Sequence, residues 1–256
     1  MDYVQAVILA FVQGVTEWLP ISSSGHLVIF QKVLGVTVPV SFDVLLHFGT
    51  LLSVVFFLRS DLSRIASSIL SGGFRSDDGK LALYVVLATV PAGLVGFLYK
   101  DFLESLFSSL HVVAGGLLFT GLLLFVSKGR EGSNRIGGVK AFMIGLMQAV
   151  SIVPGVSRSG STISCGLMLG VKREAAARFS FLMSIPVIFG AVALDAGDFM
   201  ASGLNPTIAF VGFAVSAIVG YFSLKLIWKT ILEGRFHVFA YYCWFVGLLL
   251  IVSQVA

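Results

Sequence analysis

Charged residues are absent from seven long stretches of the chain, and these uncharged stretches are strongly hydrophobic. A helix that crosses a hydrocarbon core of about 30 Å needs roughly 17–25 predominantly apolar residues. The pattern therefore predicts an all-α, polytopic membrane protein. Its membrane-spanning helices are expected near residues 42–58, 81–99, 112–127, 179–194, 207–227 and 237–254.

Composition agrees with this pattern. Of the 256 residues, 57% are hydrophobic and 12% are charged, whereas a soluble domain carries about 25% charged residues. These values exclude a water-soluble enzyme, a disordered protein and a nucleic-acid-binding protein. The two cysteines, Cys165 and Cys243, lie in apolar segments and indicate neither a disulfide framework nor a metal site.

Two parts of the chain are related to each other. A shift of 135 residues aligns 6–36 with 141–171, and nine of the 31 positions are identical. A shift of 126 aligns 111–127 with 237–253, and ten of the 17 are identical. Apolar composition raises chance matches, but it does not explain the paired Ser-x-Ser-Gly motifs. We expect a single membrane domain built from two repeats, which span residues 1–128 and 136–256.

Each repeat opens with an apolar segment that proline and a Ser/Gly cluster interrupt. Gln13–His26 reads QGVTEWLPISSSGH, and Gln148–Ser161 reads QAVSIVPGVSRSGS. Proline disrupts the helical hydrogen-bond ladder, and irregular backbone persists at membrane depth only when it is buried in protein or lines a polar cavity. We therefore expect re-entrant helix–loop–helix segments over residues 5–36 and 141–171, with three membrane spans following each of them.

The distribution of lysine and arginine orients the chain, because cytoplasmic loops carry an excess of positive charge. Four basic regions are expected on the cytoplasmic side, whereas the intervals with Asp101 and Glu104 and with Asp195 and Asp198 are expected outside. This arrangement predicts repeats of inverted topology, with re-entrant segments that meet near the midplane of the plasma membrane. It also predicts a site that opens to the extracytoplasmic side. The basic regions are 59–80, 128–140, 172–178 and 225–235.

The polar residues of the two re-entrant segments are candidates for an anion site. A charge at the bilayer centre costs about 2.5–3.5 kcal/mol, so Glu17 and Arg158 need a reason to be there. Hydroxyl groups, a guanidinium and helix N-termini together favour phosphate. The predicted phosphate-binding residues are Ser22, Ser23, Ser24, Gly25, Ser157, Arg158, Ser159, Gly160 and Thr162.

Plainer interpretations of these residues stay open. Glu17 and Arg158 also fit a purely structural ion pair, and Ser and Gly in membrane helices often serve close packing. Histidine at position 26 fits a structural hydrogen bond as well as a catalytic role. Asp43 and His47 lie one helical turn apart at the start of a predicted span, where they either support the site or cap the helix.

These residues carry a resemblance to a known family. The run from Gln13 to His26 matches an (E/Q)-x-x-x-E motif followed by S-S-x-G-H, and Pro154 to Thr162 matches P-G-x-S-R-S-x-x-T. Through these motifs the chain resembles the undecaprenyl-diphosphate phosphatase family, also called the bacitracin-resistance protein family. The resemblance extends over the whole chain. The resemblance implies hydrolysis of undecaprenyl diphosphate to undecaprenyl phosphate and inorganic phosphate. It further implies recycling of the lipid carrier for peptidoglycan synthesis and resistance to bacitracin.

We expect the following roles on this basis. Ser23 is the nucleophile of a phosphoenzyme mechanism, and His26 manages protons for Ser23 or the leaving group. Arg158 clamps the phosphoryl oxygens. Glu17 holds a divalent cation, Mg²⁺ or Ca²⁺, with support from Gln13, or acts as a base. Because position 13 is Gln and not Glu, one carboxylate fewer is present for a metal.

Several alternatives remain at this point. His26 is a rival nucleophile. A polyprenyl-phosphate transporter or flippase would use the same inverted repeats around a midplane anion site. The type 2 phosphatidic acid phosphatases are disfavoured, because their Lys-x6-Arg-Pro element is absent and position 164 is Ser. The expected partners are a polyprenyl diphosphate and membrane lipids, without nucleic acid, and a homodimer is left open.

Overall fold

The computed structural model describes the chain except residues 131, 202–203 and 256, and it describes no side chains for 194–203 and 255. The described residues form helices and contain no β-strand, so the expected all-α fold is confirmed. The helices are α1 (Tyr3–Trp18), α2 (Ser23–Val33), α3 (Val40–Phe57), α4 (Arg59–Leu70), α5 (Asp77–Leu98), α6 (Lys100–Leu106), α7 (Leu110–Val126), α8 (Gly138–Val150), α9 (Arg158–Met168), α10 (Arg173–Ala201), α11 (Pro206–Leu232), η1 (Phe236–Val238) and α12 (Phe239–Val255).

Most of the predicted spans correspond to single long helices. α3, α5, α10, α11 and the η1–α12 unit are each long and apolar enough to cross a membrane. The span predicted near 112–127 appears as α7, which has 17 residues and forms a sixth span when α6 is counted with it across a bend of 91°. The chain is therefore a multi-pass membrane protein. The side chains of Asp195 and Asp198, on which one outer interval was based, lie outside the described residues.

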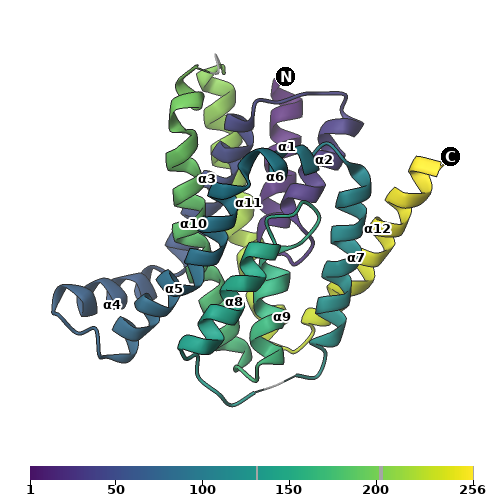
Figure 1. The fold of residues 1–256 in the computed structure, drawn as a ribbon. Coiled ribbons are helices and arrows are strands. Elements are labelled where there is room, and N and C mark those ends of the chain that lie inside the picture. The colour runs from purple at the N-terminus through teal and green to yellow at the C-terminus, as the bar shows by residue number, and fades with distance from the viewer. Residues whose placement is uncertain (131, 202–203, 256) are drawn as a thin grey trace.

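The interrupted segments form two helical hairpins. α1 packs against α2, and α8 packs against α9. α2 and α9 have 11 residues each, or about 17 Å at 1.5 Å per residue, which is about half of a hydrocarbon core. In Figure 1 the α1–α2 hairpin enters from the upper end of the molecule and α8–α9 from the lower end, and their tips meet in the middle. This geometry suits re-entrant segments; their insertion from opposite membrane faces stays a prediction.

The same local chemistry starts the second helix of each hairpin. The Ser22 side chain accepts a hydrogen bond from the Gly25 N–H at 3.3 Å, and the Ser157 side chain accepts one from the Gly160 N–H at 3.1 Å. Serine is a preferred N-cap because its oxygen satisfies a free amide of the first turn. The shift of 135 residues carries α2 onto α9 residue for residue.

The longer helices enclose the two hairpin tips. α1 and α3 both pack against α11, α12 packs against α7, and α8 packs against α5. Trp18 at the end of α1 is fully buried in the largest apolar cluster and meets Phe181 of α10 edge-on at 5.6 Å. Gly116 lets α7 cross directly over the break of the second hairpin, because a side chain there would overlap the backbone of Pro154 and Gly155. Both tips are thereby held inside the bundle.

Candidate active site

A cavity of about 270 Å³ lies where the two hairpin tips meet α3, α5 and α10. Its polar lining comes mainly from the hairpins, and its apolar lining comes mainly from the long helices. The polar residues are Glu17, Ser22, Ser23, Ser24, His47, Gln148, Ser151, Ser157 and Arg158; the apolar ones are Val44, Ala92, Ile152, Val156, Val187, Ile188, Ala191 and Val192.

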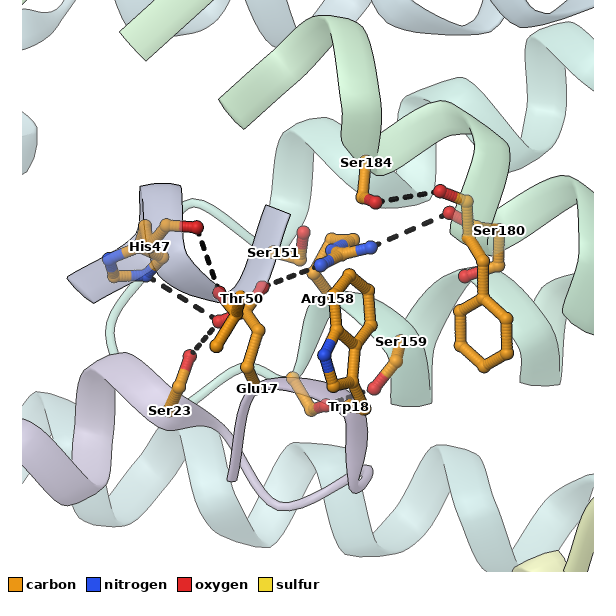
Figure 2. A network of polar contacts seen from close by, with 12 residues as sticks. Glu17, Trp18, Ser23, His47, Thr50, Ser151, Arg158, Ser159, Ser180 and Ser184 are labelled. Carbon is orange, nitrogen blue, oxygen red and sulfur yellow. Dashed lines mark hydrogen bonds and ion pairs between the residues drawn. The ribbon is translucent and has the colours of Figure 1, made fainter. Parts of the chain in front are cut away.

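The Glu17 carboxylate is the centre of the polar network, and Figure 2 shows side chains from three elements directed at it. Its Oε2 accepts hydrogen bonds from the Ser23 hydroxyl at 2.7 Å and from Gln13 Nε2 at 3.0 Å. Its Oε1 accepts a hydrogen bond from Arg158 Nη2 at 2.6 Å. The carboxylate therefore joins the first hairpin to the second.

Ser23 is the first residue of α2 and is partly accessible from the cavity. The preceding residue, Ser22, has φ of 67° and is the only described non-glycine residue with a positive φ. A left-handed conformation costs a non-glycine residue about 1–3 kcal/mol and persists only when the surroundings hold it. The strained turn presents the Ser23 hydroxyl to Glu17 at the positive end of the α2 dipole.

Arg158 occupies the corresponding first position of α9. Its guanidinium lies 5.2 Å from the Trp18 ring centroid, which is within the range of a cation–π contact. The exposed fractions of the Arg158 and Glu17 side chains are 15% and 6%, so this ion pair is largely shielded from solvent. On its other side, Nη1 makes a long contact of 3.5 Å with the Ser180 carbonyl, visible in Figure 2. The weakly held Nη1 edge is available to an incoming phosphoryl oxygen.

His47 approaches the same carboxylate from α3. Its Nδ1 donates to the Asp43 carbonyl at 2.8 Å, because a carbonyl can only accept. Its Nε2 faces Glu17 Oε2 at 3.5 Å, a contact that is attractive only when a proton lies between the two atoms. His47 is thus the histidine placed to share a proton with Glu17, and through Glu17 with Ser23.

His26 does not take the position that the sequence led us to expect. Its Nδ1 donates to the Ser22 carbonyl and its Nε2 accepts from the Tyr242 hydroxyl, both at 2.8 Å, and the two rings stack. Although positions i and i+3 lie on one helical face, these two bonds turn the ring away from Ser23. His26 does not line the cavity. With both nitrogens occupied, His26 is placed to hold the strained Ser22 turn, and its roles in proton transfer or as the nucleophile stay predictions.

The other predicted site residues divide into two groups. Ser22, Ser24 and Ser157 line the cavity beside Ser23 and Arg158. Gly25, Ser159, Gly160 and Thr162 lie behind it, where Ser159 donates to the Leu19 carbonyl and Thr162 to the Arg158 carbonyl. The Asp43 carboxylate accepts from Gln31 and supports the site only through its carbonyl, which fixes His47.

Four contributing residues were missed in the sequence. Thr120 accepts from the Ser157 N–H at 2.9 Å and donates to the Gly155 carbonyl, which braces the second tip. Ser180 bonds Thr162 and contacts Arg158, and Tyr242 bonds His26. Gln148 lines the cavity. Its alignment with Gln13 in the internal repeat could have identified it from the sequence. The other three are isolated polar residues in apolar spans, where no local pattern singles them out.

The donor set does not fit a resident divalent cation. Glu17 is already paired with Arg158 and bonded to Ser23 and Gln13. Gln13 turns its amide nitrogen toward Glu17, and its buried Oε1 has no partner. Within the part of the chain that the structure describes, no group of three or more His, Cys, Asp and Glu residues could hold a metal. Ca²⁺ takes 6–8 oxygen ligands, and Mg²⁺ is usually held by one or two carboxylates together with substrate phosphates.

Fold and site together define the class: a polytopic α-helical membrane protein with a buried hydroxyl–carboxylate–guanidinium centre suited to an anionic headgroup. Residues 6–249 match the model of the bacitracin resistance protein BacA family, and the chain belongs to this family.

Curated relatives of the chain carry the name undecaprenyl-diphosphatase. One from Rubrobacter xylanophilus is 45% identical, with 94% of each chain covered. One from Desulfosudis oleivorans is 43% identical and covers 96% of this chain and 97% of its own. One from Methanobrevibacter smithii is 40% identical over 100% of this chain and 99% of its own. The similarity extends over essentially the full length of these relatives.

Proposed function

We propose that this protein is a membrane phosphatase that hydrolyses undecaprenyl diphosphate to undecaprenyl phosphate and inorganic phosphate. The observation that carries the proposal is the hydrogen bond of 2.7 Å from the Ser23 hydroxyl to Glu17, with Arg158 bonded to the same carboxylate. A nucleophile, a proton acceptor and a cation thereby meet in one cavity. The names of the relatives support the same reaction and substrate, and the products agree with a role in peptidoglycan synthesis and bacitracin resistance.

In the first step, the Ser23 oxygen attacks the terminal phosphorus. The bond between that phosphorus and the bridging oxygen breaks, and undecaprenyl phosphate leaves with the electron pair. The Ser23 proton passes to Glu17, whose neighbour His47 shares it across the 3.5 Å contact. Arg158 shifts from Glu17 toward the phosphoryl oxygens, and the N-termini of α2 and α9 add partial positive charge.

In the second step, water attacks the phosphoserine. The bond from phosphorus to the Ser23 oxygen breaks, and inorganic phosphate leaves. Glu17 and His47 return to the Ser23 oxygen the proton taken up in the first step and accept one from the water, and this last proton leaves with the inorganic phosphate or passes to solvent. Phosphoryl transfer depends mainly on positioning and on stabilisation of charge, and the strained turn at Ser22 and the ordered Arg158 side chain supply both.

We further propose that the cavity opens to the extracytoplasmic side of the plasma membrane. Fourteen of the 17 Lys and Arg residues belong to the four regions 59–80, 128–140, 172–178 and 225–235, which the positive-inside rule assigns to the cytoplasm. The lining residues of α3 and α5, Val44 and Ala92, lie nearer the opposite ends of those helices.

The reaction is tested with purified protein in detergent and undecaprenyl diphosphate, by measuring released phosphate with and without EDTA. We expect wild-type turnover and a loss of at least about 10³-fold in Ser23→Ala, because the nucleophile is removed. The matched control is Ser24→Ala, which removes a neighbouring cavity hydroxyl that does not bond Glu17. Quenching the reaction during turnover of substrate labelled at its terminal phosphate should trap labelled phosphate on Ser23.

Two results would overturn the assignment. Label found on His26 would make that residue the nucleophile. Undiminished lipid movement in vesicles by a Ser23→Ala protein, with no phosphate release from wild type, would indicate a transporter, since transport needs no nucleophile.

Sidedness is tested in a background from which Cys165 and Cys243 have been replaced. A cysteine introduced at Val44 should react with a membrane-impermeant maleimide added to intact cells, and one at Ser133 should react only after lysis. The reverse pattern would place the cavity on the cytoplasmic side.

A further inference from the structure

One wall of the active-site cavity is apolar, and two helices supply most of it. Val187, Ile188, Ala191 and Val192 come from α10, and Ala92 comes from α5. Ile152, from the second hairpin tip, lies between them. None of these side chains can bind a phosphate, so this wall serves another part of the substrate.

α5 and α10 pack against each other, and both contribute to an apolar cluster that contains Ala88 of α5 and Phe179 and Met183 of α10. About one helical turn further along α5, Ala92 lines the cavity instead. The cavity therefore lies next to this cluster, between residues of the two helices.

The residues along this part of the two helices are small. A side chain added at Gly93 of α5 or at Gly190 of α10 would meet nothing within 4 Å, and one added at Gly96 would meet only the tip of Ile152, at 3.9 Å. Ala191 of α10 is exposed and lines the cavity. The part of the wall between α5 and α10 is therefore built from small residues with open space beside them.

We propose that an opening in this wall, formed by Ala92, Gly96, Ile152 and Ala191, binds the first isoprenoid units of the substrate and passes its chain into the bilayer. The inference rests on the proposed function. A cavity of about 270 Å³ accommodates the diphosphate and the start of the chain, and the rest has to leave through an apolar exit. The small residues on both helices set the width of the opening, and hence select a flexible isoprenoid chain.

A second apolar groove serves as the comparison. It has a volume of about 340 Å³, lies between α3 and α11, and is lined by residues such as Leu52, Phe56 and Ile218. It shares no lining residue with the active-site cavity. A chain attached to a diphosphate at Ser23 should occupy the α5–α10 opening and leave this groove free.

The first test narrows the opening. Ala92→Phe and Gly96→Leu are compared with wild type on undecaprenyl diphosphate and on methyl diphosphate, which has the same headgroup and no isoprenoid chain. We expect kcat/KM for the long substrate to fall at least about tenfold, and that for the short one to change less than about twofold. The matched control is Leu94→Phe, on the bilayer-facing side of α5 with 55% of its surface exposed, which should leave both values unchanged.

Equal losses on the two substrates, or an equal loss in Leu94→Phe, would overturn the proposal. Gly96→Leu adds its side chain to open space, so its kcat/KM values on the two substrates test the proposal even if Ala92→Phe does not fold. Wild-type protein that hydrolyses neither substrate would refute the proposed function and not the opening.

The second test locates the isoprenoid chain by cross-linking and does not depend on turnover. A polyprenyl diphosphate with a photoreactive group on an early isoprenoid unit is bound to the Ser23→Ala protein and irradiated. Cross-links to peptides of α5 and α10 are expected. Cross-links confined to α3 and α11 would place the chain in the other groove and overturn the proposal.

Discussion

The second helices of the two hairpins have equivalent bounds and N-caps, but the hairpins carry opposite chemistry. Each begins its second helix with a serine N-cap, and in each cap the serine side chain lies 3.3 Å from the serine two positions on. The shift of 135 residues nevertheless places Ser23 opposite Arg158 and Glu17 opposite Ile152. One hairpin thus supplies a hydroxyl and a carboxylate, and the other supplies a guanidinium and an apolar surface.

This difference shows how a repeated scaffold acquires an asymmetric site. The features that both hairpins share, which are the N-caps and the glycines, place two helix N-termini beside one cavity. These shared features alone favour an anion. The positions that differ between the two hairpins make the site asymmetric. They place a nucleophile on one side and a positive charge on the other, so that both can act on a phosphoryl group between them.

The largest effect is expected from removing the positive charge of the second hairpin. Arg158→Ala should lower kcat/KM by about 10³-fold, because the charge developing on the phosphoryl oxygens loses its main partner. Arg158→Lys should recover part of this loss, since lysine keeps the charge but not the planar fork. Steady-state kinetics on undecaprenyl diphosphate measure both values.

Arg158→Ala also leaves Glu17 without its ion-pair partner in a buried site. Its thermal unfolding therefore has to be compared with that of Glu17→Gln/Arg158→Ala, in which no charge is stranded. A double variant as stable as wild type and still about 10³-fold less active would assign the loss to chemistry. Full activity in either variant would make the Glu17–Arg158 contact a purely structural pair.

A smaller effect is expected from the histidine that faces Glu17. His47→Gln keeps a polar side chain on α3 but cannot share a proton with the carboxylate, so kcat should fall by roughly 10²-fold with little change in KM. A matched change, His26→Gln, should lower kcat less, because His26 lies outside the cavity.

If His26→Gln lowers kcat more than His47→Gln does, then His26 turns into the cavity when substrate binds, and the proton relay proposed for His47 is wrong.

The histidines also show where sequence reasoning succeeds and where it stops. The convergence of Glu17, Ser23 and Arg158 was predicted, because the broken segments, their N-caps and the rarity of buried charge are all local features. The all-α fold and most span positions followed from apolar run length. The bend between α6 and α7 was not predicted.

The orientation of His26 depends on Tyr242, a partner 216 residues away. A side-chain rotamer that a distant helix selects leaves no trace in the local pattern. The same holds for His47, whose distance from Glu17 is set by the packing of α3 against α11 and α10. Spacing within one helix therefore pointed to His26 and could not show that His47 faces Glu17; the part that His26 plays in proton transfer stays a prediction.

Removing the hydrogen bond between His26 and Tyr242 should lower kcat moderately. Tyr242→Phe removes the hydroxyl that holds His26 Nε2 and loosens the strained Ser22 turn. We expect kcat to fall by about tenfold, the equivalent of ~1.4 kcal/mol, with KM nearly unchanged. The control is Tyr241→Phe, the neighbouring residue on α12, which bonds neither His26 nor Ser22. A fall in KM and kcat together, or the same loss in the control, would contradict a positioning role for Tyr242.

The smallest effect concerns the glutamine that the two hairpins share. Gln13 and Gln148 occupy equivalent positions, and only Gln13 lies against the Glu17 carboxylate. Gln13→Glu adds a second carboxylate there, and two adjacent carboxylates with substrate phosphates are the oxygen ligands that Mg²⁺ prefers. Added Mg²⁺ should therefore raise phosphate release more in Gln13→Glu than in wild type, whereas Gln148→Glu should respond as wild type does. Equal increases in the two variants would mean that a general negative potential, and not the pairing with Glu17, attracts the cation; that outcome would remove the distinction between the hairpins at this position.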